Sequence, residues 1–205
     1  MIRLLHIAAL QEQLPTLLQW DQDWFLKINV AWSSALGDWL FPILRNPITW
    51  APLYALLIAL VIYRYRWKAV AWIVFLGLTV LLADQISSSI IKPYFARVRP
   101  CNEPELKGLM HMLLPYCGGN GSFTSSHAVN HFALAFFFQK SLKPLLGKWA
   151  QLFYLWAALI CYAQVYVGAH YPTDVIGGAL LGLLIGALLF YFFKRYFYWP
   201  QTDTP

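Results

Sequence analysis

A histidine and an aspartate stand four residues apart in the stretch Gly168–Asp174, which lies between two long apolar runs. Pro172 suits the first turn of a helix, where its missing N–H costs nothing, so we expect a helix to begin near Pro172 with His170 in the turn before it. Asp174 would then reach a ring nitrogen of His170, fix its tautomer and stabilise an imidazolium as charge develops. The pair suits a histidine that attacks a substrate, although a capped, hydrogen-bonded loop would use the same residues.

Three cations stand within eight residues, at Lys92, Arg97 and Arg99, at the end of another apolar run. Lysine and arginine there suit a phosphate group, because both donate charge-assisted hydrogen bonds to its oxygens. Anchoring at a membrane interface is the alternative use of such residues. Asp84 and Ser88 precede Lys92 at intervals of four and would share one helix face with it. Because a carboxylate inside an apolar run indicates a functional site, we expect Asp84 to support this site indirectly or to make a structural polar contact.

A glycine-rich loop over 118–121 leads into hydroxyl residues where the next apolar run begins. Ser125 is a candidate N-cap, and the free N–H groups of the following helical turn would bind an anion. His127 lies in that turn and is a candidate proton donor to a leaving oxygen. An ordinary capped helix with a surface histidine is the alternative.

Together these segments hold cations and helix N–H groups for a phosphoryl group, a nucleophile with its orienting carboxylate, and a proton donor. Phosphoryl transfer through a covalent phosphohistidine needs these groups. His127 and His131 also have the spacing of zinc-binding helices, which raises a metal site as an alternative. No glutamate follows His127, and the nearby lysine and arginines would repel a cation, so we expect no metal and no cofactor.

The elements that must position these segments are membrane helices. Of the 205 residues, 60% are hydrophobic and 12% are charged, whereas a soluble domain is about one-quarter charged. The net charge of +6 is not a nucleic-acid footprint, because most basic residues lie in short loops or at helix ends. We expect an all-α polytopic bundle with five strong transmembrane helices, over about 48–63, 67–91, 125–141, 146–167 and 172–194.

Residues 1–46 are expected to form an amphipathic segment, followed by a helical membrane domain over 47–196 and a tail over 197–205. Aromatic and apolar residues recur in the first segment at roughly helical spacing with charges between them, at Trp20, Trp24, Phe25, Ile28, Trp32, Leu36, Trp39 and Leu40. This pattern favours one or two helices lying in the membrane interface. A sixth span over about 24–44 is the alternative. The apolar run over 4–10 is too short for a signal peptide.

Basic residues cluster in the loops around 64–68 and 140–148 and after the last helix, and by the positive-inside rule they lie in the cytoplasm. The other face then carries 92–124, 164–171 and the N-terminal segment, and with them every chemical candidate. In a bacterial inner membrane this face is periplasmic. Cys101 and Cys117 both lie on it, and we expect them to form a disulfide in an oxidising compartment. Closing this loop of about 15 residues contributes on the order of 3 kcal/mol to stability.

The polar segments resemble the signature of the type 2 phosphatidic acid phosphatase superfamily, which includes membrane lipid phosphatases and vanadium haloperoxidases. The first family motif is Lys, six residues, then Arg-Pro, and it is matched by Lys92, Arg99 and Pro100. The second is Pro-Ser-Gly-His, which this chain matches at Ser125 and His127, while Thr124 and Ser126 replace the proline and glycine. The third ends in His, three residues, Asp, and is matched by His170 and Asp174.

One position departs from this pattern. Where the family has Ser-Arg in the third motif, this chain has Ala163-Gln164. A hydrogen bond to a charged group contributes about 1.5–3 kcal/mol, against about 1 for a neutral pair. Gln164 is kept as a candidate phosphate ligand, with activity lowered, retuned to another phosphate ester, or lost. Arg97 is a candidate to compensate for the missing arginine.

The resemblance implies roles for the matching residues. His170 would be the nucleophile, Asp174 its relay partner and His127 the general acid, while Lys92, Arg99, Ser125 and the Ser126 backbone would bind phosphate. The implied function is an integral membrane phosphatase that hydrolyses a lipid or polyprenyl phosphate or diphosphate at the outer face. Two alternatives stay open: a catalytically weakened phosphate-binding membrane protein, because of Gln164, and a metal-dependent membrane hydrolase, because of His127, His131 and His170.

Overall fold

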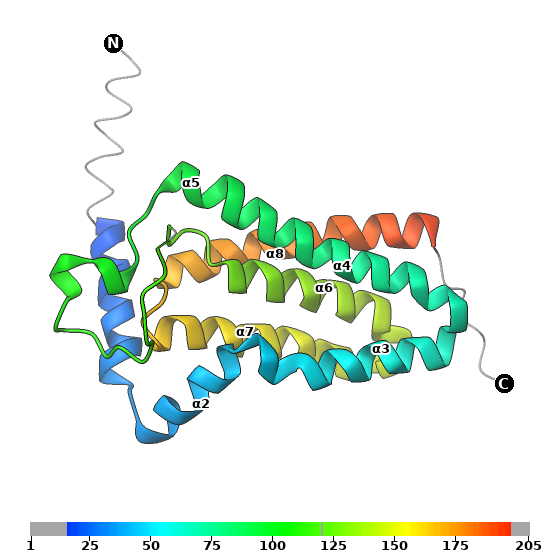
Figure 1. Ribbon diagram of the computed structural model, residues 1–205, viewed down its shortest axis with the longest axis horizontal. Helices are drawn as coiled ribbons and strands as arrows, with labels where there is room; N and C mark the ends of the chain where they lie inside the picture. The colour runs from blue at the N-terminus through cyan, green and yellow to red at the C-terminus, as the bar shows by residue number, and fades with distance from the viewer. Residues whose placement is uncertain (1–15, 120, 198–205) are drawn as a thin grey trace, which may run out of the picture.

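A computed structural model describes residues 16–119 and 121–197, and within these ranges the regular structure is helical, with no strand. Five long helices run side by side as an elongated bundle (Figure 1). Their bounds are Ala51–Tyr65 (α3), Ala69–Gln85 (α4), Ser126–Leu146 (α6), Leu152–Tyr166 (α7) and Pro172–Tyr196 (α8). They correspond to the five apolar runs of the sequence, and the all-helical fold is confirmed.

Three continuous helical stretches are long and apolar enough to cross a membrane, Pro47–Phe95, Ser126–Tyr166 and Pro172–Tyr196. The first two contain a reversal, where the short 3₁₀ helices Arg66–Lys68 and Gly147–Gln151 turn the chain back beside itself (Figure 1). Arg66 and Gly147 adopt positive φ at these turns, 54° and 55°. The chain is therefore an integral membrane protein, and five separate crossings remain a prediction.

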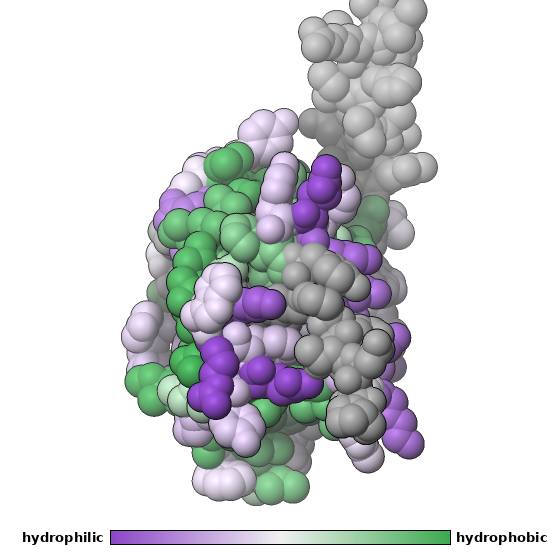
Figure 2. Space-filling view, turned by 90° about the vertical axis from the view of Figure 1, so that its right-hand side faces the viewer, coloured by the Kyte–Doolittle hydropathy of each residue, from purple (hydrophilic) through white to green (hydrophobic). Residues whose placement is uncertain are grey.

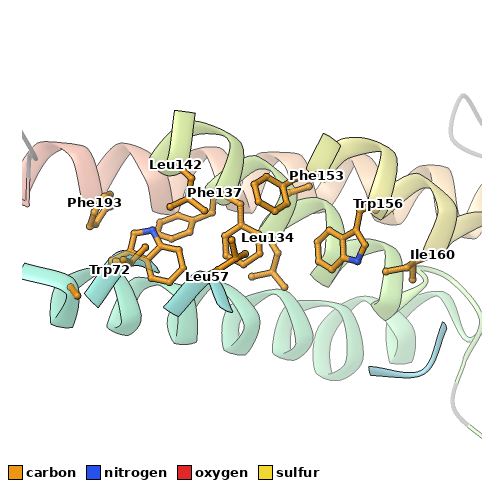
Figure 3. Close-up of a cluster of buried hydrophobic side chains, with 14 residues drawn as sticks. Leu57, Trp72, Leu134, Phe137, Leu142, Phe153, Trp156, Ile160 and Phe193 are labelled. Carbon is orange, nitrogen blue, oxygen red and sulfur yellow. The ribbon is translucent and has the colours of Figure 1, made fainter. Parts of the chain in front are cut away.

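The core lies between α6 and the helices around it. Side chains from all five long helices meet there, among them Leu57, Trp72, Phe137, Trp156 and Phe193 (Figure 3). The indole Nε1 of Trp72 donates to the hydroxyl of Ser141 at 2.9 Å, so its buried N–H has a partner. This aromatic packing holds α6 at the centre of the bundle.

Glycines on one face of α8 let it pack closely on α6. They stand four apart at Gly178, Gly182 and Gly186, and a Cβ added at Gly182 would lie 2.4 Å from the carbonyl oxygen of Val129. Small residues at this interval allow membrane helices to approach backbone to backbone. The N–H of Ser125, just before α6, donates to the carbonyl of Asp174 at 3.0 Å. The close packing therefore fixes the first turns of α6 and α8 relative to each other.

Two shorter helical segments lie at one end of the bundle (Figure 1). A helix over 16–26 continues through a π-helical turn, Lys27–Ala31, and α2 covers Ala35–Arg45. The chain turns between them at 32–34, so 24–44 is not one continuous helix. Asn29 is fully buried, and its amide nitrogen donates to the carbonyls of Tyr166 and His111. The expectations for residues 1–15 and 198–205, including the signal peptide, lie outside the described residues.

The segment after α4 leads into a long loop, residues 96–125, at the same end of the bundle. A π-helical turn, Ile86–Ile91, joins α4 to the short helix α5, Lys92–Phe95, which ends at Ala96 with φ 45°. π-helical turns are frequent at functional sites because they rotate the side chains that follow them. The predicted disulfide Cys101–Cys117 is present in this loop, with a Cα–Cα distance of 5.8 Å.

Candidate active site

His170 lies just before α8 and is almost fully buried. Its Nδ1 is 3.5 Å from Oδ2 of Asp174 and 3.4 Å from the hydroxyl of Ser122. Its Nε2 is 3.2 Å from the guanidinium Nη1 of Arg99, which can only donate. This arrangement favours the tautomer with the proton on Nδ1, directed at the carboxylate, and the lone pair on Nε2. Burial lowers the pKa of His170 to about 4, against the opposing effect of Asp174, so the ring is neutral at pH 7.

Asp174 is fully buried and accepts hydrogen bonds at both carboxylate oxygens. Oδ2 accepts from the backbone N–H of Tyr171 at 2.9 Å and from the hydroxyl of Ser122. Oδ1 accepts from Nη1 of Arg97 at 2.7 Å. These donors stabilise the ionised carboxylate, which is the form that orients an imidazole.

Arg97 lies behind Asp174 and joins it to the N-terminal helix. Its Nη2 is 2.5 Å from Oδ2 of Asp21, and Nη1 also donates to the hydroxyl of Thr173 at 2.7 Å. Asp21 accepts from the N–H of Thr173 at 2.9 Å and is 1% exposed. Two carboxylates hold its guanidinium, and its side chain also lines a second cavity with Lys92 and Arg99, so its compensation for position 164 stays a prediction.

A cavity of about 310 Å³ lies beside His170 and brings together most of the predicted site residues. Lys92 and Arg99 enter it from the segment after α4, and Gln164 enters it from α7. Among the described residues that line it, none is a carboxylate. Its lining is Arg45, Ser88, Lys92, Arg99, Cys101, Leu114, Pro115, Tyr116, Gly118, Ser126, His127, Gln164, Ala169 and His170.

The two cations of the first motif are held by backbone carbonyls. Nζ of Lys92 donates to the carbonyl of Gly121 at 3.0 Å, and Nη1 of Arg99 donates to that of Ala169 at 3.3 Å. Burial lowers the pKa of Arg99, while the charge of Asp174 raises it. Both side chains are therefore fixed at the cavity, positively charged and ready to bind an anion.

The first turn of α6 contributes to the cavity unevenly. Ser125 caps the helix, its hydroxyl accepting from the N–H of Ala128 at 3.4 Å, and it is fully buried outside the cavity lining. Ser126 and His127 do line the cavity. The ring of His127 stacks on that of His131, with centroids 6.1 Å apart and planes at 5°. The structure therefore brings His127 together with His170, but it uses the hydroxyl of Ser125 within the helix.

Gln164 is fully buried at the cavity, and neither its Oε1 nor its Nε2 has a partner among the described residues. Asp84 lies outside the cavity, where it accepts from the hydroxyl of Ser88 at 3.4 Å. It lines a neighbouring hollow of about 360 Å³ that shares Ser126 and His127 with the cavity. Within the described part of the chain, no three His, Cys, Asp or Glu side chains gather as metal ligands.

Sequence reasoning missed three residues of this region. Ser122 stands in the glycine-rich loop and touches both His170 and Asp174. Asp21 is one of the charged residues that lie between the apolar positions of the N-terminal amphipathic segment, and no motif marks it. Arg45 lies just before the first long span, and no motif or spacing in the sequence singles it out.

Comparison with known proteins gives concordant results. A family model described as the PAP2 superfamily matches residues 71–198. The lipid A 4'-phosphatase of Bacteroides thetaiotaomicron is 31% identical, over 84% of this chain and 76% of that protein. The lipid A 4'-phosphatase of Porphyromonas gingivalis is also 31% identical, over 92% of this chain and 80% of that protein. The crystal structure of a transmembrane PAP2-type phosphatidylglycerolphosphate phosphatase from Bacillus subtilis has the same fold, with a TM-score of 0.65, 23% identity and 88% coverage of each chain.

Proposed function

Since this chain belongs to the PAP2 superfamily and is a membrane phosphatase of lipid phosphates, we propose that it works through a phosphohistidine at the outward face of the membrane. The observation that carries this proposal is the environment of His170. One ring nitrogen faces a buried carboxylate, and the other faces a cationic cavity beside Arg99. A neutral imidazole held in this way presents a lone pair to an electrophile bound by the cations.

In the proposed reaction, Nε2 of His170 attacks phosphorus and the bond to the leaving oxygen breaks. Asp174 stabilises the positive charge that develops on the ring through the Nδ1 proton. Lys92, Arg99 and the N–H groups at the start of α6 neutralise the phosphoryl oxygens. His127 donates a proton to the leaving oxygen. It then takes a proton from a water that attacks the phosphohistidine, which releases phosphate and restores His170.

The outward location rests on the distribution of charge. Basic residues of the two reversals and of the end of α8 lie at the end of the bundle opposite the cavity, where hydrophilic groups gather in Figure 2. The disulfide Cys101–Cys117 lies at the cavity end. Positive charge favours the cytoplasmic side and disulfides favour an oxidising one. In a bacterial inner membrane, the site would therefore face the periplasm.

We propose a phosphorylated glycolipid of the lipid A type as the substrate. The support is that two lipid A 4'-phosphatases match 84% and 92% of this chain. A phosphatidylglycerophosphatase B and an undecaprenyl-diphosphatase, both from Bacillus subtilis, match 60% and 58% of it. Phosphatidylglycerophosphate and undecaprenyl diphosphate are therefore the comparison substrates.

The test is phosphate release by purified protein from these three lipids, with wild type beside His170→Ala. We expect turnover to be fastest on the lipid A-type substrate and to disappear in the variant. Undiminished release by His170→Ala would refute the nucleophile. Faster release from a comparison lipid would refute the substrate assignment alone.

A catalytically weakened phosphatase that mainly binds phosphate is the second candidate, favoured by the neutral amide of Gln164 at the cavity. It predicts slow phosphate release from every lipid, together with saturable binding of orthovanadate that His170→Ala weakens. Faster release by Gln164→Arg would support it, and unchanged release would count against it.

A further inference from the structure

The side chains that line the cavity give it an excess of positive charge. Lys92 and Arg99 bring positive charge, and the residues described around it include no carboxylate. Gln164 adds an amide whose oxygen and nitrogen are both buried without a partner among the described residues. Buried polar atoms are normally hydrogen-bonded, so such an amide beside cations indicates room for a bound group.

Arg45 also lines this cavity, from the last residue of α2. It stands two residues before the first long helical stretch, Pro47–Phe95, and 119 positions before Gln164 in the chain. The Nε of Arg45 is buried and has no hydrogen-bond partner among the described residues. A guanidinium offers five N–H donors in a planar fork, so an unpartnered Nε at a cavity wall is available to an oxyanion.

The backbone around Arg45 is well fixed. The hydroxyl of Thr49 donates to the carbonyl of Ile43 at 2.7 Å, and Nε1 of Trp50 donates to that of Leu44 at 2.7 Å. These bonds satisfy carbonyls at the end of α2 and tie it to the start of the following span. Phe41 packs on Tyr166 of α7, with ring centroids 4.4 Å apart. The last turn of α2 is therefore held against the same helix that carries Gln164.

Among the residues that the structure describes, no carboxylate forms an ion pair with Arg45. Burial lowers its pKa, and the positive charge of Arg99 lowers it further. The same two guanidiniums would each gain from an anion placed between them, because opposite charge favours the protonated form. An arginine used only as an interfacial anchor would extend to water or lipid headgroups and would not line this cavity.

We propose that Arg45 is a phosphate-binding residue, which supplies from α2 the guanidinium that position 164 lacks. A phosphoryl oxygen of the substrate lies between Arg45 and Arg99, and the amide of Gln164 donates a neutral hydrogen bond to the same group. This inference deepens the proposed function and rests on it. The site would then hold two arginines, Arg99 and Arg45. Arg45 comes from α2, whereas the family motif places its arginine at position 164 of α7.

The test compares Arg45→Gln with the double variant Arg45→Gln/Gln164→Arg. Lys107→Gln is the control, because Lys107 is an exposed cation that does not line the cavity. Phosphate release and orthovanadate binding are measured on each full-length purified protein. We expect Arg45→Gln to lower kcat/KM and orthovanadate affinity by about 10- to 100-fold, as for the loss of a hydrogen bond to a charged group. The double variant should recover most of both losses, and Lys107→Gln should match the wild type.

A structural role for Arg45 predicts a different pattern, because an arginine at 164 cannot restore the end of α2. Unchanged orthovanadate affinity in Arg45→Gln would overturn the binding role, whatever happens to turnover. A double variant no better than Arg45→Gln would overturn the equivalence of the two positions. If the wild type releases no phosphate, the proposed function fails, and the orthovanadate measurements still decide the role of Arg45.

Discussion

Arg97 donates to Oδ1 of Asp174 at 2.7 Å, on the side of the carboxylate away from His170. The same guanidinium reaches Asp21 of the N-terminal helix at 2.5 Å. The orientation of His170 therefore depends on a chain of charged groups that starts in a segment outside the family signature. Arg97 is a positioning residue in this arrangement. It contacts Asp174 behind the imidazole, and its other hydrogen bonds go to Asp21 and Thr173.

Replacing Arg97 by lysine should lower kcat and leave KM nearly unchanged. Lysine keeps the charge but cannot fork to both carboxylates, so Asp174 loses its fixed orientation. Small misplacements of a catalytic group reduce turnover, and we expect a loss of about 10- to 100-fold. Steady-state phosphate release measures both constants, with Lys107→Gln as the control. A raised KM at unchanged kcat would instead indicate direct contact with the substrate.

The stability of the protein should fall as the pH drops from about 6.5 to about 4, and His170 should account for part of the fall. Burial sets the pKa of His170 near 4, below the usual 6.5 of an unfolded histidine. Between these values the unfolded state takes up a proton that the folded state does not, so acid favours unfolding.

The measurement is the unfolding midpoint in detergent at several pH values, for wild type and His170→Gln. The difference in unfolding midpoint between wild type and His170→Gln should change between about pH 6.5 and about pH 4 and stay constant at lower pH. A gap that does not vary with pH would mean that His170 titrates normally in the folded protein.

Replacing Gln164 by methionine should weaken phosphate binding without lowering stability. Methionine has a similar length and removes the amide, which has no partner among the described residues. Losing a neutral donor to a charged phosphate should reduce orthovanadate affinity by about tenfold. Calorimetric binding and thermal unfolding of the same preparation check both parts. A marked drop in the unfolding midpoint would assign Gln164 a structural role.

Adding a methyl group at Gly182 should reduce both stability and turnover. The new Cβ would lie 2.4 Å from the carbonyl oxygen of Val129, so α6 and α8 must separate and carry His127 away from His170. Overpacking of this kind costs about 1–3 kcal/mol.

Gly77→Ala is the matched control for this change. A Cβ at Gly77 meets nothing within 4 Å, and alanine is a better helix former than glycine by up to about 1 kcal/mol. Thermal unfolding and phosphate release of both variants check the prediction. If the two variants had the same unfolding midpoint and the same rate of phosphate release, the close contact between α6 and α8 would not determine the positions of His127 and His170.

The long helices and the disulfide could be predicted because each has a local signal. Apolar runs bounded by basic loops predicted α3, α4, α6, α7 and α8 with ends that differ from the observed ones by up to six residues. The motif spacing identified His127 and His170, and the structure brings both to one cavity. Their catalytic roles remain predictions.

The remaining features depend on packing between distant segments, which leaves no periodic pattern. Arg45 reaches the cavity only because α2 folds back onto α7, and Ser122 reaches Asp174 only because the loop crosses the start of α8. Arg97 stands beside the cations of the first motif in the sequence, and only the fold shows that its guanidinium pairs with Asp21, 76 positions away, and with Asp174. Ser125 caps α6 as predicted, and the capping hydrogen bond from the N–H of Ala128 occupies its hydroxyl oxygen.

The hydrogen bond between Asp21 and Thr173 joins residues 152 positions apart. The ribosome synthesises the helix that carries Asp21 before α8. The hydrogen bond can therefore form only after the 152 residues up to Thr173 have been added. Until residues 170–174 have been synthesised, the nascent chain lacks His170 and Asp174, although Asp21, Arg97, Arg99 and Ser122 are already present. With His170 as the proposed nucleophile, a chain cut short before these residues would release no phosphate from any lipid.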